Sequence, residues 1–404
     1  MNRLMVRIHL LALILLSIFG NSFLKFKLII PSFFLITYFL FCTLHVLLYF
    51  LQKKISITKN EQKLIKFIFF MIISILLSLL GFYKFFDLNG IYFDSKYILK
   101  QVMFLDLLPI GLSVYICFIN QSKMIEELLK KYSQKFFILF CILSIVGLCK
   151  NTVSYYTLLL LSFIELNKEN RRLFYKLIIF LITAIYIKNI FSESTAFLML
   201  LIYMIVLIFN KNFFDFLYKK RKIIYVLIVI LLLIAVVNKD LIISYLQIKD
   251  PNYWWRFSYW MTELETLKDT YFLGVGFGST YASTSIFEVL SGGFIDPETG
   301  VFVNSVKVLF TTAQHNSYMN ILYRTGLIGI ILFVRLVFSL IFKYKKYLRT
   351  NYDKMLYLAF LNANIIITFN VGLESPQFLI PFYFSLFGLM SLEKKYKIND
   401  KGVI

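Results

Sequence analysis

Charged side chains are scarce in this sequence. Asp, Glu, Lys and Arg make up only 16% of its 404 residues, and hydrophobic residues make up 59%. A soluble globular domain carries about 25% charged residues. This deficit excludes a soluble fold class and predicts a protein that crosses a membrane many times.

Acidic residues are the rarer of the two charges. The sequence has 22 acidic and 43 basic side chains, which gives a formal net charge of +21. The excess does not indicate nucleic-acid binding, because no basic patch interleaved with aromatic residues occurs in a soluble stretch. Lysine and arginine accumulate in the cytoplasmic loops of membrane proteins, and we interpret the charge in that way.

Cysteine and histidine are rare too. The four cysteines are Cys42, Cys117, Cys141 and Cys149. They lie in or beside apolar runs, without a Cys-x-x-Cys spacing, so we interpret them as small apolar residues. Of the three histidines, His9 and His45 lie inside apolar runs, as packed histidines do. No second ligand stands at zinc spacing from His315, so the sequence predicts no metal site.

Long apolar runs are abundant. About twelve are long enough to cross about 30 Å of hydrocarbon at about 1.5 Å per residue. They begin near Leu4, Leu28, Leu64, Ile98, Phe136, Val153, Phe174, Thr195, Ile223, Ile321, Met355 and Phe378. The expected fold class is therefore all-α, a membrane bundle of about twelve transmembrane helices.

The basic residues predict an orientation for this bundle. They gather in alternate connections, among them 53–63, 123–135, 219–222, 343–354 and 394–401. Such clusters mark the cytoplasmic side, so both termini are expected there. The chain then divides into an N-terminal part of about nine helices (1–238), an extracytoplasmic loop (239–313), and about three C-terminal helices with a cytoplasmic tail (314–404).

The outward loop concentrates the unusual residues. Aromatic side chains surround Arg256, and the pattern of 261–270 predicts a short amphipathic helix on the membrane surface. The glycines Gly274, Gly276 and Gly278 follow. Their spacing differs from that of a dinucleotide-binding loop and no βαβ unit surrounds them, so no cofactor is predicted. They indicate backbone with positive φ that approaches another group closely.

Two arginines and one histidine are suited to an anionic substrate. Arg256 and Arg324 flank the loop at its membrane ends, and an arginine fork can hold a phosphate or pyrophosphate. The alternative for Arg256 is an interfacial arginine stacked on Trp254 or Trp260. His315 precedes a helix, where it could donate to a phosphate oxygen or relay a proton.

No general base is singled out by the sequence. The acids available on the outward side are Glu263, Glu265, Glu288, Asp296, Glu298 and Glu374. None has a distinctive spacing, and each is expected to be a solvated loop residue.

Four motifs follow one another across the loop and the next helix. They are aromatic-Arg-x-x-x-Trp ending at Trp260, Gly-Val-Gly-x-Gly at 274–278, His-Asn-x-Tyr at 315–318, and Gly-x-x-Gly at 326–329. This order resembles the O-antigen ligase and Wzy polymerase superfamily. The family often has a Ser-Arg pattern in an earlier helix, whereas Ser194-Thr195-Ala196 lacks the arginine. A second pyrophosphate contact would then come from Lys188 or Arg324.

The resemblance implies a metal-independent glycosyltransferase in a bacterial cell (inner) membrane that uses sugars on undecaprenyl pyrophosphate. Arg256 would grip the pyrophosphate and His315 would act at the reacting centre. The substrate-binding candidates are Arg324, Trp254, Trp255, Trp260, Gly274, Gly276, Gly278, Asn316 and Tyr318. Membrane lipid, a chain-length regulator and a flippase of the same pathway are the expected partners.

These motifs do not separate two activities. A polymerase joins the repeat units of a surface polysaccharide such as O-antigen or capsule, and a ligase moves the finished glycan onto lipopolysaccharide core or a protein. We expect a polymerase, because such polymerases are more numerous and divergent. A lipid-linked oligosaccharide flippase is the alternative from another class, but the sequence lacks the internal repeats that transporters show.

Overall fold

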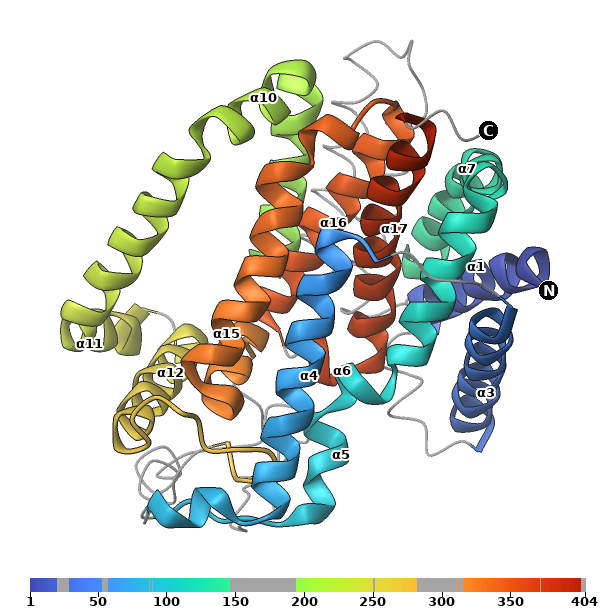
Figure 1. Cartoon of the computed structure of the whole chain (residues 1–404). Helices are drawn as coiled ribbons and strands as arrows, with labels where there is room; N and C mark the ends of the chain where they lie inside the picture. The colour runs from blue at the N-terminus through green and yellow to red at the C-terminus, as the bar shows by residue number, and fades with distance from the viewer. Residues whose placement is uncertain are drawn as a thin grey trace.

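A computed structural model describes residues 1–19, 29–52, 57–86, 88, 90–145, 194–249, 251–281, 310, 315–370 and 372–400. Throughout these residues the chain forms helices joined by turns, with one isolated antiparallel bridge between Phe93 and Ser279. Figure 1 shows the helices gathered side by side into a bundle. The all-α class predicted from the sequence is confirmed for the described residues.

The helices fall into two groups along the chain. The first contains α1 (Asn2–Phe19), α3 (Ile29–Gln52), α4 (Lys59–Leu79), η1 (Phe82–Phe86), η2 (Ser95–Tyr97), α5 (Ile98–Gln101), α6 (Met103–Asp106) and α7 (Leu108–Ile145). The second contains α10 (Ser194–Val237), α11 (Lys239–Lys249), α12 (Pro251–Asp269), α15 (Ser317–Lys343), η3 (Tyr344–Tyr347), α16 (Asn351–Phe369), η4 (Gly372–Glu374) and α17 (Pro376–Asp400).

Three of the described helices are long and apolar enough to cross a membrane. They are Phe34–Gln52 of α3, all of α4, and Ser317–Tyr347, which covers α15 and η3. A fourth is added if the bent pair Asp215–Val237 and Lys239–Leu246 forms one span. The twelve spans predicted from the sequence are thus not all found among the described residues.

Two of the predicted spans are joined in α10. The sequence predicts separate helices beginning near Thr195 and Ile223, and both fall within the 44 residues of α10. Helical hydrogen bonding continues through α10, which contains neither glycine nor proline. Figure 1 shows α10 turning sharply along its length, and its second arm includes Asp215–Val237. The predicted spans beginning near Val153 and Phe174 lie outside the described residues.

One end of the bundle is rich in lysine and the other contains the glycine motif, and Figure 1 shows the helices at each end. At the lysine-rich end, Lys345 and Asp215 form an ion pair at 2.6 Å, and Lys395 lies 3.5 Å from Asp353. These pairs join η3 to α10 and α17 to α16. At the opposite end lie η1, α5, α12 and the glycine-containing segment that follows α12.

Capping boxes start two helices at the lysine-rich end. The Thr58 hydroxyl accepts from the Glu61 N–H at 3.3 Å, and the Thr350 hydroxyl accepts from the Asp353 N–H at 3.2 Å. Each carboxylate accepts in return from the backbone N–H of the capping threonine. The Thr-x-x-acid pattern before an apolar run therefore fixes where α4 and α16 begin.

Aromatic packing holds α15 within the bundle. α15 packs on α4, and α17 packs on both α7 and α16. The Phe67 ring of α4 lies 5.1 Å from the Phe333 ring of α15 and 5.6 Å from the Phe104 ring of α6, between centroids. All three side chains are buried. α15, which carries much of the candidate site, is thereby fixed against the N-terminal half.

The predicted outward loop is helical in its first part. A bend of 75° separates the end of α10 from α11, and α12 follows. The sequence predicts a short helix at 261–270 on the membrane surface, but α12 begins at Pro251 and packs on α15. Its buried face carries Tyr259, Glu263 and Leu267. The helix predicted over 261–270 is thus confirmed for 261–269 and is longer at its start, and its position on the membrane surface stays a prediction.

Candidate functional site

The glycine-containing segment 270–281 fills a break in α15. Gly326 has non-helical angles inside that helix, φ 67° and ψ −166°. Three backbone hydrogen bonds join the two elements: Val275 N to Tyr323 O at 2.8 Å, Gly276 N to Arg324 O at 3.1 Å, and Leu327 N to Phe272 O at 2.9 Å. The segment therefore supplies hydrogen bonds that an unbroken helix would make with itself.

The backbone of segment 270–281 lies against the backbone of α15 at this break. A Cβ atom on Gly274 would lie 2.7 Å from Arg324 O, and one on Gly326 would lie 2.3 Å from Phe272 O. Both glycines have positive φ, +90° for Gly274 and +67° for Gly326. Positive φ and close approach at the glycine motif, which the sequence predicts, are confirmed.

The opposite side of segment 270–281 is held by the N-terminal half. The Ser78 hydroxyl at the end of α4 accepts from Phe277 N at 2.8 Å. The buried Gln101 side chain accepts from Gly278 N at 2.7 Å and donates to Ser279 O at 2.9 Å. Side chains far away in the sequence thus fix the segment from both sides.

Replacing Gln101 with methionine is expected to destabilise the protein by about 2–6 kcal/mol, because two buried backbone groups lose partners at roughly 1–3 kcal/mol each. Thermal unfolding of the detergent-solubilised protein measures the loss. Leu99→Met on the exposed side of α5 is the control. An unchanged unfolding temperature for the Gln101 variant would show that the segment does not depend on this contact.

Arg324 lies at the centre of the junction and is fully buried. Its Nη1 atom donates to Ser279 O at 2.7 Å and lies within bonding distance of Gly276 O and Thr280 O, at 3.3 and 3.4 Å. The guanidinium lies 4.3 Å from the Tyr281 ring centroid. In the described part of the chain, its Nε and Nη2 atoms have no hydrogen-bond partner. Arg324 thus clamps the segment through its carbonyl groups.

Glu374 shares a small cavity with Arg324. The cavity measures about 20 Å³, enough for about one water molecule, and Gln101 lines it as well. The Tyr281 hydroxyl donates to one carboxylate oxygen of Glu374 and the Asn320 amide donates to the other. Burial raises the pKa of Glu374, and the charge of Arg324 opposes the rise.

The outward acids differ in their exposure. Glu374 is 7% exposed and Glu263 only 1%, so the prediction that they are solvated loop residues is wrong for both. Packing of α12 and η4 against α15 buries them. Glu265, on the other side of α12, is 50% exposed and pairs with Lys239 at 2.5 Å, as a solvated residue does. Glu288, Asp296 and Glu298 lie outside the described residues.

His315 and Arg256 are brought together from different elements. Arg256 lies on α12, and His315 directly precedes the N-cap of α15. Burial, together with the charge of Arg256, lowers the pKa of His315 to about 4. The imidazole is therefore neutral near pH 7. A neutral imidazole beside an arginine can accept a proton from a hydroxyl while the arginine holds an anion.

The backbone of His315 is strained. Its φ of 49° lies in the left-handed region, where a residue with a side chain costs about 1–3 kcal/mol. Asn316 follows as the N-cap of α15, accepting from the N–H groups of Tyr318 and Met319 at 3.0 and 3.1 Å. The cap fixes the start of the helix and so holds the histidine in place, and strain of this kind gathers at functional sites.

The lowered pKa of His315 predicts a loss of stability in acid. The unfolded chain binds a proton below about pH 6.5, whereas the folded chain resists protonation until about pH 4. Stability therefore falls as pH decreases through this window, by about 2 kcal/mol between pH 7 and pH 5. Unfolding of wild type and His315→Asn is compared at both values. The asparagine variant is expected to lose less, and equal losses would contradict the prediction.

The other predicted substrate-binding residues have contacts within the fold. Asn316 is occupied as a helix cap, and the Tyr318 hydroxyl donates to Asn364 Oδ1 at 2.9 Å. The tryptophans of α12 are the half-buried Trp254 and Trp260, with Trp255 on the same helix. Gly276 and Gly278 lie in the segment that Arg324 clamps.

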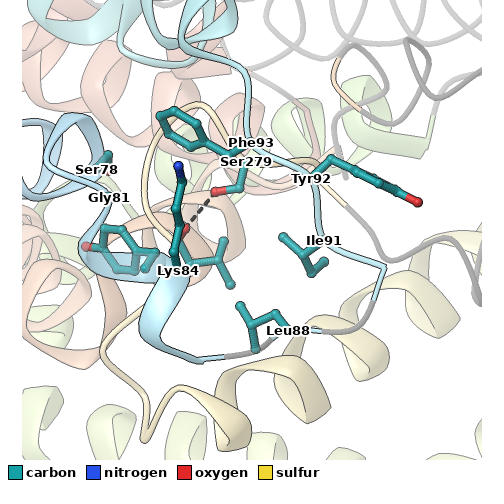
Figure 2. A pocket seen from close by; sticks show the side chains of 10 residues that line it. Ser78, Gly81, Lys84, Leu88, Ile91, Tyr92, Phe93 and Ser279 are labelled. Carbon is teal, nitrogen blue, oxygen red and sulfur yellow. Dashed lines mark hydrogen bonds between the residues drawn. The ribbon is translucent and has the colours of Figure 1, made fainter.

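A larger cavity opens beside the glycine motif. It measures about 230 Å³ and lies between the end of α4, η1, residues 88–93 and the glycine-containing segment. Figure 2 shows the side chains that surround it, including Lys84, Tyr92, Phe93 and Ser279. Aromatic, hydroxyl and ammonium groups therefore line one cavity next to the site.

The sequence model of one family, O-antigen ligase, matches residues 177–334. Residues 177–334 are similar to that family and are called the O-antigen ligase segment here. No curated protein and no solved structure matches the chain. The O-antigen ligase segment contains Arg256, the glycine motif, His315 and Arg324, which agrees with the superfamily resemblance seen in the motifs.

Part of the site comes from outside the O-antigen ligase segment. Ser78 and Gln101, which hold the glycine-containing segment, precede it in the chain, and Glu374 follows it. Sequence motifs could not identify these residues because each stands alone in its local sequence. They become part of the site only through the packing of α4, α5 and η4 around α15.

Proposed function

We propose that the protein is a surface-polysaccharide polymerase, which joins oligosaccharide repeat units carried on undecaprenyl pyrophosphate. The observation that supports this proposal is the pairing of Arg256 with a neutral His315 inside the O-antigen ligase segment. Glycosyl transfer from a lipid pyrophosphate needs a cation for the departing anion and an acceptor for the hydroxyl proton. This pair supplies both.

In the proposed reaction, a hydroxyl of the acceptor unit attacks the anomeric carbon of the donor. The new glycosidic bond forms as the bond between that carbon and the pyrophosphate oxygen breaks. The hydroxyl proton passes to His315, and the electron pair leaves with the pyrophosphate, which Arg256 holds. The anion placed between them raises the pKa of His315 from about 4 and makes the imidazole a better base. A single displacement of this kind inverts the anomeric centre.

Arg324 acts as a positioning residue in this proposal. Its Nη1 atom is engaged by the carbonyls of segment 270–281, and its side chain is fully buried. It fixes the backbone beside the reacting groups, and its charge adds to the positive potential that favours an anionic lipid carrier.

The proposed orientation places the glycine-rich end outside the cell. The lysine-rich end would face the cytoplasm together with both chain termini, as basic clusters do in multi-pass membrane proteins. The site would then meet its lipid-linked substrates at the outer face of a bacterial cell membrane. A flippase and a chain-length regulator would act before and alongside it.

The 230 Å³ cavity is the proposed binding place for a sugar ring of the acceptor. It is somewhat smaller than the range of about 300–1,000 Å³ that holds drug-sized ligands. Tyr83, Tyr92 and Phe93 line it, and aromatic faces are suited to apolar sugar faces. Lys84 lies at its exposed side, where an ammonium can donate to sugar hydroxyls.

Lys84→Gln is expected to raise the KM for the acceptor roughly 3–10-fold with little change in kcat, because one charged hydrogen bond to the bound sugar is weakened. Chain extension is measured at varied acceptor concentration with purified protein. The control is Lys96→Gln, since Lys96 is also exposed but pairs with Asp94 at 2.5 Å. An equal change of KM in both variants would contradict the assignment of this cavity to the acceptor sugar.

The test of function is the surface glycan of a strain that lacks this chain, separated by length. Complementation uses wild type, Arg256→Ala or His315→Asn, with membrane levels of each protein measured in parallel. A polymerase deletion leaves a core that carries a single repeat unit, and neither variant restores the ladder. Accumulation of long lipid-linked chains would identify a ligase, and an unchanged ladder would favour a flippase.

A further inference from the structure

Two histidines and a cysteine meet at one buried point far from the glycine motif. His9 comes from α1, His45 from α3 and Cys117 from α7, and all three are at most 3% exposed. One potential ligand atom of each lies within 4.8 Å of the others. The sequence showed no such cluster, because three helices separated by up to about a hundred residues bring it together.

The hydrogen bonds orient both imidazoles toward a common centre. Ser113 Oγ lies between them, 2.9 Å from His9 Nε2 and 2.7 Å from His45 Nδ1. The remaining ring nitrogen of His45 donates to Asn2 Oδ1 at 2.7 Å, which leaves Nδ1 with its lone pair facing inward. His9 Nδ1 lies 2.7 Å from the Tyr38 hydroxyl. Outer partners of this kind fix the tautomer of metal-binding histidines.

A second cysteine stands beside the cluster. Cys42 is fully buried and lies beside Ser113 and Tyr38. The point therefore gathers two imidazoles and one thiol, with the Cys42 thiol outside this group but close by, in a chain that has only three histidines and four cysteines. Imidazole and thiolate are the ligands that thiophilic transition metals prefer.

We propose that His9, His45 and Cys117 bind one thiophilic metal ion, Zn²⁺ with Cys42 as the fourth ligand or Cu⁺ without it. Both complexes are electrically neutral, because two thiolates balance Zn²⁺ and one balances Cu⁺. Neutrality suits a buried position among apolar helices. Each thiol releases its proton to solvent on binding.

Small movements bring the ligands to bonding geometry. In a tetrahedral zinc site the ligand atoms are about 3.5 Å apart, given bonds of about 2.0 Å to nitrogen and 2.3 Å to sulfur. The separations of up to 4.8 Å among His9, His45 and Cys117 must therefore contract by about an ångström, and Cys42 must move in from outside this group to complete a zinc site. Ser113 Oγ vacates the centre by turning to a backbone carbonyl of the preceding helical turn, a bond that helical serines commonly make.

The ion would join the N-terminal helices to the bundle. α1 and α3 each pack on α7, which carries both Ser113 and Cys117. A metal ion held by all three helices fixes this arrangement, and it takes no part in glycan transfer at the other site.

The experiment measures bound metal in the purified full-length protein. Cells are grown with added zinc or added copper, and the metal content per chain is determined by plasma mass spectrometry after purification without chelators. Wild type is expected to hold one ion per chain. Cys117→Ser and His45→Gln are expected to bind it at least about 10–100-fold more weakly, the loss that even outer partners cause.

Two controls separate ligand loss from misfolding. His315→Asn alters the histidine outside the cluster, and Cys141→Ala alters a cysteine of α7 beyond the kink at Gln121, so both are expected to retain the ion. In the wild type itself, added metal should protect Cys42 and Cys117 from alkylation by a maleimide, and a chelator should reverse the protection. Cobalt substitution should give thiolate charge-transfer absorption.

The outcomes are distinct. If Cys42→Ser weakens the binding of a stoichiometric ion, the site holds zinc with four ligands. If Cys42→Ser leaves the binding unchanged, the site holds copper with three ligands. Wild-type protein that binds neither ion and shows no metal-dependent protection would overturn the proposal, leaving the cluster as a hydrogen-bonded network.

Discussion

His315→Asn is expected to lower the rate of glycan transfer by roughly 10²–10⁴-fold, the contribution of a positioned proton acceptor. Asparagine adopts positive φ more readily than most residues, so it keeps the backbone at φ 49° without the imidazole. The measurement is kcat for chain extension by purified protein with a lipid-linked repeat unit as donor and acceptor.

The matched control for this variant is Glu265→Gln on the exposed side of α12. It changes a charged residue of the same helix that bears Arg256 but should leave kcat unaltered. If His315→Asn remains folded and extends chains at the wild-type rate, His315 is not the proton acceptor. The proposed mechanism would then need another base, and the buried Glu263 would be the first to test.

Gly274→Ala is expected to destabilise the protein by about 3 kcal/mol or more, because it combines left-handed strain with overpacking. The new Cβ would lie 2.7 Å from both Arg324 O and Gly326 N. These are backbone atoms of α15, so they cannot turn aside as a side chain can. Thermal unfolding in detergent, together with the yield of monodisperse protein, measures the effect.

Gly81→Ala separates the two contributions. Gly81 has a similar φ of +75°, but the nearest atom to its Cβ position is a Lys84 side-chain carbon at 3.5 Å. Only strain of about 1–2 kcal/mol is expected there. If both variants unfold at the same temperature, the close approach at Gly274 does not limit stability.

Hydrophobic runs in the sequence were enough to predict several helices. The runs beginning near Leu28 and Phe378 correspond to α3 and α17, because an apolar stretch in a membrane has few alternatives to a helix. The break in α15 was not predictable in the same way. It depends on the backbone of Phe272 and Val275, which pair with the helix across about fifty residues of sequence.

The candidate site was predicted unevenly for a similar reason. Motif order placed Arg256 and His315 in one site, and the structure brings them together. Glu374 was placed among solvated acids, because a lone acid between two helices has no local signal of burial. Glu263 did have one, since Tyr259 and Leu267 stand four residues before and after it on the same face of α12.

The clamp made by Arg324 has a consequence for how the protein is synthesised. Segment 270–281 leaves the ribosome before Arg324, and domains form from the N-terminal side as the chain grows. Until α15 arrives, the carbonyl groups of Gly276, Ser279 and Thr280 lack Arg324, and of these Ser279 O can pair with Gln101 and Gly276 O with the Ser279 hydroxyl, which leaves Thr280 O without its donor. Unpaired carbonyls are costly in hydrocarbon. The nascent segment must therefore remain in water until α15 is synthesised, and a chain truncated before α15 does not form the site.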